Sequence, residues 1–193
     1  MCKHLYFIGG TMGIGKTTAC QRLKERLWKS VFLDGDNCWD SHPFTVNEET
    51  KTMVIDNICY VLSRFLKSNA YDHVIFCWVL HEQSIIDAIL DGVCRLVDGN
   101  VSWKFHNISL ICRKEALIAR LSGDIEKGLR SSDIIERSTI RLPYYAYLKT
   151  HKIDVSDLSA EDTATWIIES PFVTLEGPFP CDHGDQEPSS PGC

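Results

Sequence analysis

The sequence lacks the features that mark membrane-spanning, secreted and general nucleic-acid-binding proteins. Its longest apolar run, 74–80, is far too short to cross a bilayer. No C-x-x-C pair occurs among its nine cysteines, and an odd count without a secretory signal is typical of the reducing cytosol. Positive charge is also scarce, since the formal net charge of −6 argues against a general nucleic-acid-binding surface. We therefore expect a cytoplasmic protein that binds neither membranes nor nucleic acids in general.

Proline is scarce until the last part of the chain. Five of the seven prolines follow residue 170, in a stretch that also carries Gly and Ser and has little periodicity. We predict one α/β domain at 1–170, which is long enough to bury a full core, and a flexible tail at 171–193. Cys181 and His183 lie in this tail, but two such ligands in a flexible segment do not indicate a metal site. The first strand already begins near residue 4, so we expect no signal peptide.

Short apolar runs alternate with amphipathic segments along the predicted domain. The predicted strands are 4–8, 31–33, 74–80, 106–112 and 152–155. The predicted helices are 17–28, 45–67, 81–97, 114–121, 133–150 and 160–169. Pro143 should bend the fifth helix, and Asp133 and Glu136 are spaced as a capping box at its start. The alternation predicts a parallel sheet with helices on both faces, and ligands bind such sheets at the carboxyl ends of the strands.

Residues 10–18 match the phosphate-binding loop pattern G-x-x-x-x-G-K-[ST] at every fixed position. The loop follows a predicted strand and precedes a predicted helix, whose amino end also favours an anion. Glycines let backbone N–H groups turn toward a phosphate, Lys16 would reach the β and γ oxygens, and the Thr17 hydroxyl would bind Mg²⁺. The predicted ATP-binding residues are Gly10, Thr11, Met12, Gly13, Ile14, Gly15, Lys16, Thr17 and Thr18.

Two carboxylates, Asp34 and Asp36, follow the second predicted strand. Residues two apart leave a strand on the same side. One carboxylate can bind magnesium or its water, and the other can take a proton from a substrate hydroxyl, as phosphoryl transfer needs. The alternative is that D-G-D-N is simply a good turn sequence.

Four arginines lie in or beside a glycine-containing segment at about 121–133, which we predict to be a mobile lid. They are Arg120, Arg130, Arg137 and Arg141. Phosphoryl transfer needs cations around the γ-phosphate, so we expect at least two of them, Arg120 and Arg130 first, to contact phosphate. The alternative is a solvated helix face on which Arg137 pairs with Asp133.

Residues near the ends of the second and third strands are candidates for binding the phosphoryl acceptor. Trp39 can offer a flat surface to a ring, although core packing explains it equally well. His81 follows the third strand, where a histidine is also often exposed or beside a helix cap. No aspartate directly follows the apolar run of that strand, so the usual Walker-B carboxylate is either missing or replaced by Asp34.

With these motifs the chain, over roughly 3–169, resembles the small P-loop kinases of the nucleoside and nucleotide kinase superfamily. Residues 33–37, L-D-G-D-N, are similar to a stretch of adenylylsulfate kinases, and shikimate kinases carry a D-x-D there. The resemblance, which extends to gluconate kinases, implies a five-stranded parallel sheet in the order 2-3-1-4-5 with helices on both faces and an arginine-bearing lid. It implies Asp36 as the acceptor-side base and Asp34 as the magnesium-side carboxylate. The further substrate motifs of adenylylsulfate kinases are absent, so the resemblance does not name the acceptor.

Together these observations predict a kinase that moves the γ-phosphoryl group of ATP, with Mg²⁺, to a hydroxyl or phosphate of a small molecule. The expected catalytic residues are Lys16, Asp36, Arg120 and Arg130; the metal ligands Thr17 and Asp34; and the acceptor-binding residues Asp36, Trp39 and His81. The alternative is a nucleotide-binding regulatory or partner-binding module with little turnover. A GTPase is disfavoured because no N-K-x-D motif follows the fourth strand.

Overall fold

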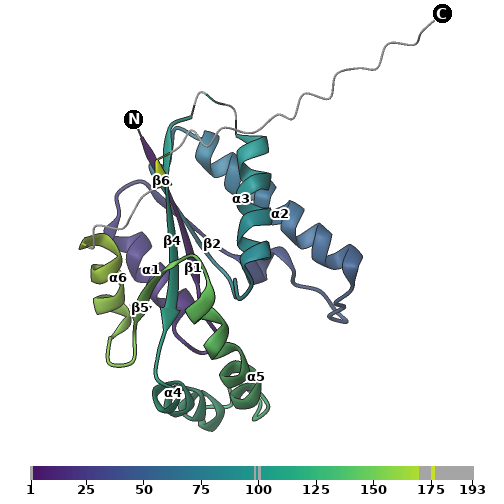
Figure 1. The fold of residues 1–193 in the computed structure, drawn as a ribbon, viewed down its shortest axis with the longest axis vertical. Helices are drawn as coiled ribbons and strands as arrows, with labels where there is room; N and C mark the ends of the chain where they lie inside the picture. Colours follow the sequence, from purple (N-terminus) through teal and green to yellow (C-terminus); the bar gives the residue numbers. More distant parts are fainter. Residues whose placement is uncertain (1, 98, 100, 170–174, 177–193) are drawn as a thin grey trace, which may run out of the picture.

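The computed structural model describes residues 2–97, 99, 101–169 and 175–176. Its central sheet contains the parallel strands β1 (Lys3–Gly9), β2 (Ser30–Asp34), β3 (His73–Cys77), β4 (Trp103–Ile111) and β5 (His151–Asp154). Their order is β2-β3-β1-β4-β5, which confirms the predicted order (Figure 1). A short strand, β6 (Leu175–Glu176), pairs antiparallel with β4 and was not predicted. The rest of the predicted tail at 171–193, with Cys181 and His183, lies outside the described residues.

Helices cover both faces of the sheet, as the alternating pattern predicts (Figure 1). They are α1 (Lys16–Arg26), α2 (Glu48–Lys67), α3 (Gln83–Leu96), α4 (Lys114–Glu126), α5 (Ile134–Arg141) and α6 (Ala160–Glu169), with the 3-10 turns η1 (Gly35–Cys38) and η2 (Leu142–Tyr147). The helices α2 and α3 lie together on one face, whereas α1 and α6 lie on the other. No helix within the described part of the chain is both long and apolar enough to cross a membrane.

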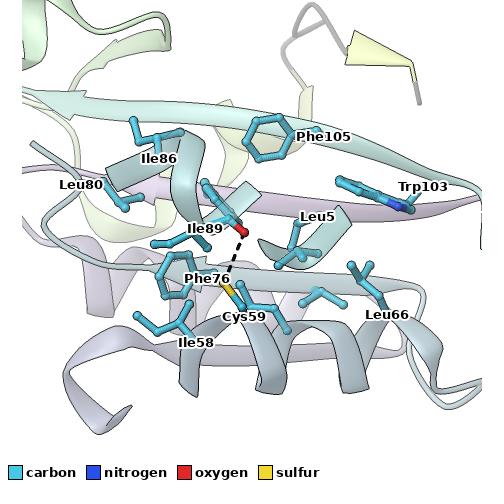
Figure 2. Close-up of a cluster of buried hydrophobic side chains, with 14 of the residues drawn as sticks. Leu5, Ile58, Cys59, Leu66, Phe76, Leu80, Ile86, Ile89, Trp103 and Phe105 are labelled. Atoms are coloured by element: carbon cyan, nitrogen blue, oxygen red, sulfur yellow. Dashed lines mark hydrogen bonds between the residues drawn. The ribbon is translucent and has the colours of Figure 1, made fainter. Parts of the chain in front are cut away.

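The buried strands supply side chains to two separate cores. Along β1, Leu5 and Phe7 point toward α2 and α3, and Tyr6 and Ile8 point toward α1 and α6. In Figure 2 the first of these cores holds Phe76 of β3 and Phe105 of β4, the two strands on either side of β1, together with aliphatic residues of α2 and α3. Four cysteines predicted to be small core side chains are buried: Cys20, Cys59, Cys77 and Cys112.

Aromatic and histidine rings stack on the sheet face toward α1 and α6, near the amino ends of three strands. The rings belong to His4, Tyr6, His73 and His106. His4 Nδ1 and His106 Nε2 share a hydrogen bond of 2.9 Å. Burial, followed by the charges of the neighbouring His4 and His73, lowers the pKa of His106 to about 4. This ring stack therefore holds His106 neutral at physiological pH.

Helix ends depart from the predictions in ways that their hydrogen bonds explain. Asn47 caps α2 through a reciprocal capping box with Thr50. The predicted capping box of Asp133 is wrong, because this carboxylate bonds the Ser131 hydroxyl and Arg137 instead of a backbone N–H. The predicted fifth helix ends at Arg141, just before Pro143, and continues as η2.

The segment predicted as a lid at 121–133 is helical over its first part, since α4 extends to Glu126 rather than ending at Leu121. The third strand is shorter than predicted, because it ends at Cys77 and not at Leu80. Leu80 has a positive φ of 44°, a conformation that branched side chains seldom adopt and that turns the chain away from the sheet. The Gly10 N–H donates to the Val79 carbonyl over 3.3 Å, so the residues after β3 contact the phosphate-binding loop.

Candidate nucleotide-binding site

The phosphate-binding loop joins β1 to α1 at the carboxyl edge of the sheet. Gly10, Gly13 and Gly15 have positive φ values of 155°, 78° and 105°, which favour glycine. A Cβ at position 13 would lie 2.2 Å from Leu121 Cδ2, so only glycine lets α4 pack this closely on the loop. A Cβ at position 15 would meet no atom within 4 Å, so this part of the loop faces open space. The loop is thus closed on the side of α4 and open where α1 begins.

Lys16, the first residue of α1, is held across the loop. Its Nζ donates a hydrogen bond of 3.1 Å to the Thr11 carbonyl. Burial lowers the pKa of Lys16 below its usual value, and nearby acidic groups, Asp36 and Asp34 among them, act in the opposite direction. The Thr11 hydroxyl donates to the Ser138 carbonyl of α5 over 2.8 Å, which ties the loop to that helix. A phosphate in the loop would supply the negative partner that the Lys16 ammonium needs.

Thr17 and Asp34, the two predicted metal ligands, are in direct contact. Thr17 Oγ1 donates to Asp34 Oδ2 over 2.7 Å, and Asp34 Oδ1 accepts the Asp36 N–H over 3.2 Å. The second bond makes Asp34 the amino-terminal cap of η1. A hydroxyl and a carboxylate are hard oxygen donors of the kind that Mg²⁺ prefers, so the residues present fit this ion.

Asp36 is oriented by a tryptophan that the sequence analysis did not single out. Trp78 Nε1 donates to Asp36 Oδ1 over 3.1 Å. The Trp78 ring also packs over Gly35, because a Cβ there would lie 2.6 Å from Trp78 Cγ. In the parallel pairing of β2 with β3, Asp34 lies opposite Cys77, so the residues that follow them come together. An indole N–H at the end of an otherwise apolar run was the available signal.

A cavity of about 330 Å³ brings most of the predicted catalytic residues together. Its lining includes Met12, Gly13, Gly15, Lys16, Thr17, Thr18, Asp34, Asp36, Arg120 and Arg130, all of them predicted site residues. Trp78, Val79 and Asp124 complete the lining. The cavity lies at the carboxyl edge of the sheet, the side on which α4 and α5 stand in Figure 1. Phosphate-loop, acidic and basic groups therefore face one space.

The arginines occupy different settings. Arg120 donates to the Ile14 carbonyl over 3.2 Å and to the carbonyls of Val155, Ser156 and Leu158 after β5. Arg130 pairs with Asp124 over 3.1 Å. Both line the cavity, whereas Arg137 pairs with Asp133 on α5, as the alternative of a solvated helix face predicts. The cations of the described lining are therefore Lys16, Arg120 and Arg130, and Arg141 lies behind it with its guanidinium 3.7 Å from Met12 Sδ.

The two other predicted acceptor residues are separated. Trp39 lines a second cavity that also touches Asp36. His81 lines neither cavity; it stacks on Tyr144 of η2 with ring centroids 6.4 Å apart and pairs with Glu82 over 3.2 Å. Burial lowers the pKa of His81, and Glu82 opposes that shift. Of Trp39 and His81, Trp39 is therefore the one that shares a cavity lining with Asp36, the candidate base.

Residues 7–140 match the sequence model of the AAA domain family. The chain belongs to this family. A comparison with curated proteins finds no match. Among solved structures, the tunicamycin resistance protein of Deinococcus radiodurans has a TM-score of 0.63 at 18% identity, covering 86% of this chain and 93% of that chain. A gluconokinase from Sinorhizobium meliloti has a TM-score of 0.59 at 15% identity, covering 85% and 89%.

The APS kinase of Mycobacterium tuberculosis, solved with AMPPNP and APS, has a TM-score of 0.55 at 14% identity and covers 86% of this chain and 95% of that chain. These similarities extend over nearly the whole length of each neighbour. The family member described here therefore has the fold of small-molecule P-loop kinases, as the resemblance from its motifs predicts.

Proposed function

We propose that this protein transfers the γ-phosphoryl group of Mg-ATP to a hydroxyl or phosphate of a small metabolite. The observation that carries the proposal is the single cavity that joins the glycine loop, Lys16, the Thr17–Asp34 pair and Asp36. Each of these groups has a separate task in phosphoryl transfer. A loop that only bound phosphate would not need Asp36, the candidate base. The kinase fold of the solved neighbours supports the same reaction class.

The loop and Lys16 bind the nucleotide. Loop N–H groups and the amino end of α1 stabilise the negative phosphates, and Lys16 Nζ exchanges the Thr11 carbonyl for phosphate oxygens. Thr17 and Asp34 would hold Mg²⁺, which would supply positive charge to the phosphates when bound. Asp34 thereby takes the place of the carboxylate that the third strand lacks.

Asp36 acts on the acceptor. Trp78 occupies one carboxylate oxygen of Asp36, so the other oxygen can take the proton of an acceptor hydroxyl. As that proton leaves, a bond forms between the acceptor oxygen and the γ-phosphorus, and the bond from this phosphorus to the bridging oxygen of ADP breaks. Arg120 and Arg130 supply positive charge beside the cavity while negative charge spreads over the transferring group.

The test is ATP consumption against a panel of hydroxylated and phosphorylated metabolites, with Mg²⁺ present. Acceptor-dependent ADP release that is lost in Lys16→Ala and strongly reduced in Asp36→Asn supports the proposal. Tight Mg-ATP binding with no transfer to any metabolite would instead favour a nucleotide-binding regulatory module.

A further inference from the structure

A second cavity, of about 390 Å³, adjoins the nucleotide cavity through Asp36. Its lining comprises Asp36, Asn37, Trp39, Asp40 and Phe44, from η1 and the loop that leads to α2. This volume falls within the usual range of small-molecule sites. Because Asp36 lines both cavities, a molecule in the second one lies beside the candidate base.

One wall of this cavity is aromatic. The rings of Trp39 and Phe44 lie 5.0 Å apart at an angle of 42°. Trp39 is partly buried and packs against the core beside α2, whereas Phe44 is 62% exposed. Because the Trp39 ring is partly buried against the core, it is held in place, and its remaining exposed surface can stack against the face of a ligand ring.

The polar part of the lining is acidic. Asp36 and Asp40 contribute carboxylates, Asn37 contributes an amide, and the described residues lining this cavity include no Lys, Arg or His. Asn57 of α2 donates to the Cys38 carbonyl over 3.4 Å and also lines a third cavity with acidic residues, of which Glu48 pairs with Lys51 over 2.8 Å. These acidic residues are Glu48, Glu49 and Asp56.

The two cavities therefore differ in charge. The lining of the nucleotide cavity has three cations, Lys16, Arg120 and Arg130, which balance the carboxylates of Asp34, Asp36 and Asp124, whereas the lining of the second cavity has two carboxylates and no cation to balance them. A carboxylate, sulfate or phosphate group placed there would meet Asp36 and Asp40 at close range and be repelled. Hydroxyl and N–H groups of a ligand could instead donate hydrogen bonds to the carboxylates of Asp36 and Asp40.

We propose that the phosphoryl acceptor is a hydroxylated ring compound without negative charge. Its ring face stacks on Trp39, its N–H groups donate to Asp40, and its reacting hydroxyl donates to Asp36. This inference rests on the proposed kinase function and narrows its acceptor. Uncharged nucleosides and amino sugars share this chemistry, and the experiment treats them as separate arms.

The experiment measures ADP release with Mg-ATP for four probes in parallel: uridine, glucosamine, gluconate and shikimate. Calorimetry first establishes Mg-ATP binding by the full chain. We expect transfer to uridine or glucosamine, and negligible transfer to the two carboxylates.

Variants then test the cavity itself. Trp39→Ala should raise the KM for the accepted probe by about tenfold, since a stacking partner is lost. Trp166→Ala, an exposed tryptophan on α6, is the matched control and should leave this KM unchanged. Because Trp39 also packs against the core, Asp40→Lys on an exposed side chain is a second variant, and it should raise the KM for glucosamine about fivefold. Asp91→Lys on α3 is its charge control.

Three results would overturn the inference, and they are distinct. Preference for gluconate or shikimate would refute the acceptor class while the kinase function stands. Transfer to uridine or glucosamine with an unchanged KM in both Trp39→Ala and Asp40→Lys would place the acceptor elsewhere. Mg-ATP binding without transfer to any of the four probes would overturn the inference alone, because the wider metabolite panel decides the kinase function.

Discussion

Thr17 Oγ1 donates a hydrogen bond to Asp34 Oδ2 over 2.7 Å, which joins the first turn of α1 to the last residue of β2. The two residues are far apart in the sequence, yet their oxygens lie side by side on the lining of the nucleotide cavity. Asp36 stands two residues further along, with a different partner, Trp78. The two carboxylates of D-G-D-N therefore have different partners: Asp34 lies with Thr17 on the predicted metal side, and Asp36 lies with Trp78 on the predicted acceptor side.

The first prediction separates these tasks. Asp36→Asn keeps the size of the side chain and removes its basic oxygen, so kcat should fall by about 10²–10⁴-fold while Mg-ATP affinity stays nearly intact. Asp34→Asn should weaken Mg-ATP binding as well, because it removes a charged oxygen from the metal side. Steady-state kinetics and calorimetry on both variants provide the comparison. Near-normal turnover in Asp36→Asn would reduce D-G-D-N to a turn.

The second prediction concerns Lys16. Lys16→Ala should weaken Mg-ATP binding by about tenfold or more, because a charge-assisted contact contributes roughly 1.5–3 kcal/mol. Lys24→Ala is the control, since Lys24 lies on the same helix outside the cavity lining, and its backbone carbonyl, which accepts from the Ser30 hydroxyl, is kept in the variant. Titration calorimetry measures both affinities, and equal values would contradict the assignment of the loop.

The third prediction tests Trp78 as a positioning residue. Trp78→Phe keeps a ring over Gly35 but removes the N–H that holds Asp36. Because only the orientation of the base is disturbed, kcat should fall by about tenfold with little change in the KM for ATP. Thermal unfolding serves as the check on folding: a lower Tm with unchanged kcat would show that Trp78 is only structural.

The fourth prediction compares two glycines. Gly13→Ala places a Cβ against Leu121 at a residue with positive φ, so it should destabilise the fold by roughly 1–3 kcal/mol. Gly123→Ala, on α4 with no atom near its Cβ, should instead stabilise it by roughly 0.5–1 kcal/mol. Urea unfolding measures both, and a harmless Gly13→Ala would contradict the close packing of α4 on the loop.

The fifth prediction is a pH dependence. Burial lowers the pKa of His106 to about 4, below its ordinary value near 6.5, so the unfolded chain takes up a proton at higher pH than the folded one. Its contribution to stability is therefore complete above about pH 6.5 and decreases as the pH falls toward 4, by roughly 2–3 kcal/mol in all. Urea unfolding at several pH values should show a flatter profile in His106→Gln than in His42→Gln, which alters an exposed histidine. Parallel profiles would contradict this account.

The sequence predicted the sheet and the phosphate-binding loop because both depend on local patterns. Buried parallel strands are continuous apolar runs, and the loop needs glycine and lysine at fixed spacing. The role of Trp78 could not be predicted in this way, because its contact with Asp36 arises from the β2–β3 pairing. Likewise, the spacing of Asp133 and Glu136 predicted a capping box, but the Asp133 carboxylate accepts hydrogen bonds from the Ser131 hydroxyl and the Arg137 guanidinium. The closing of 121–133 over the substrate stays a prediction.

Within the described part of the chain, the hydrogen bonds of Arg120 go to backbone carbonyls, those of Ile14 and of Val155, Ser156 and Leu158 after β5. A carbonyl is the same acceptor whatever side chain its residue carries. Residues 155–158 can therefore change identity during evolution without loss of this brace, provided that the backbone keeps its course. The side chains at 155–158 can therefore vary while Arg120 keeps its place on the lining of the nucleotide cavity.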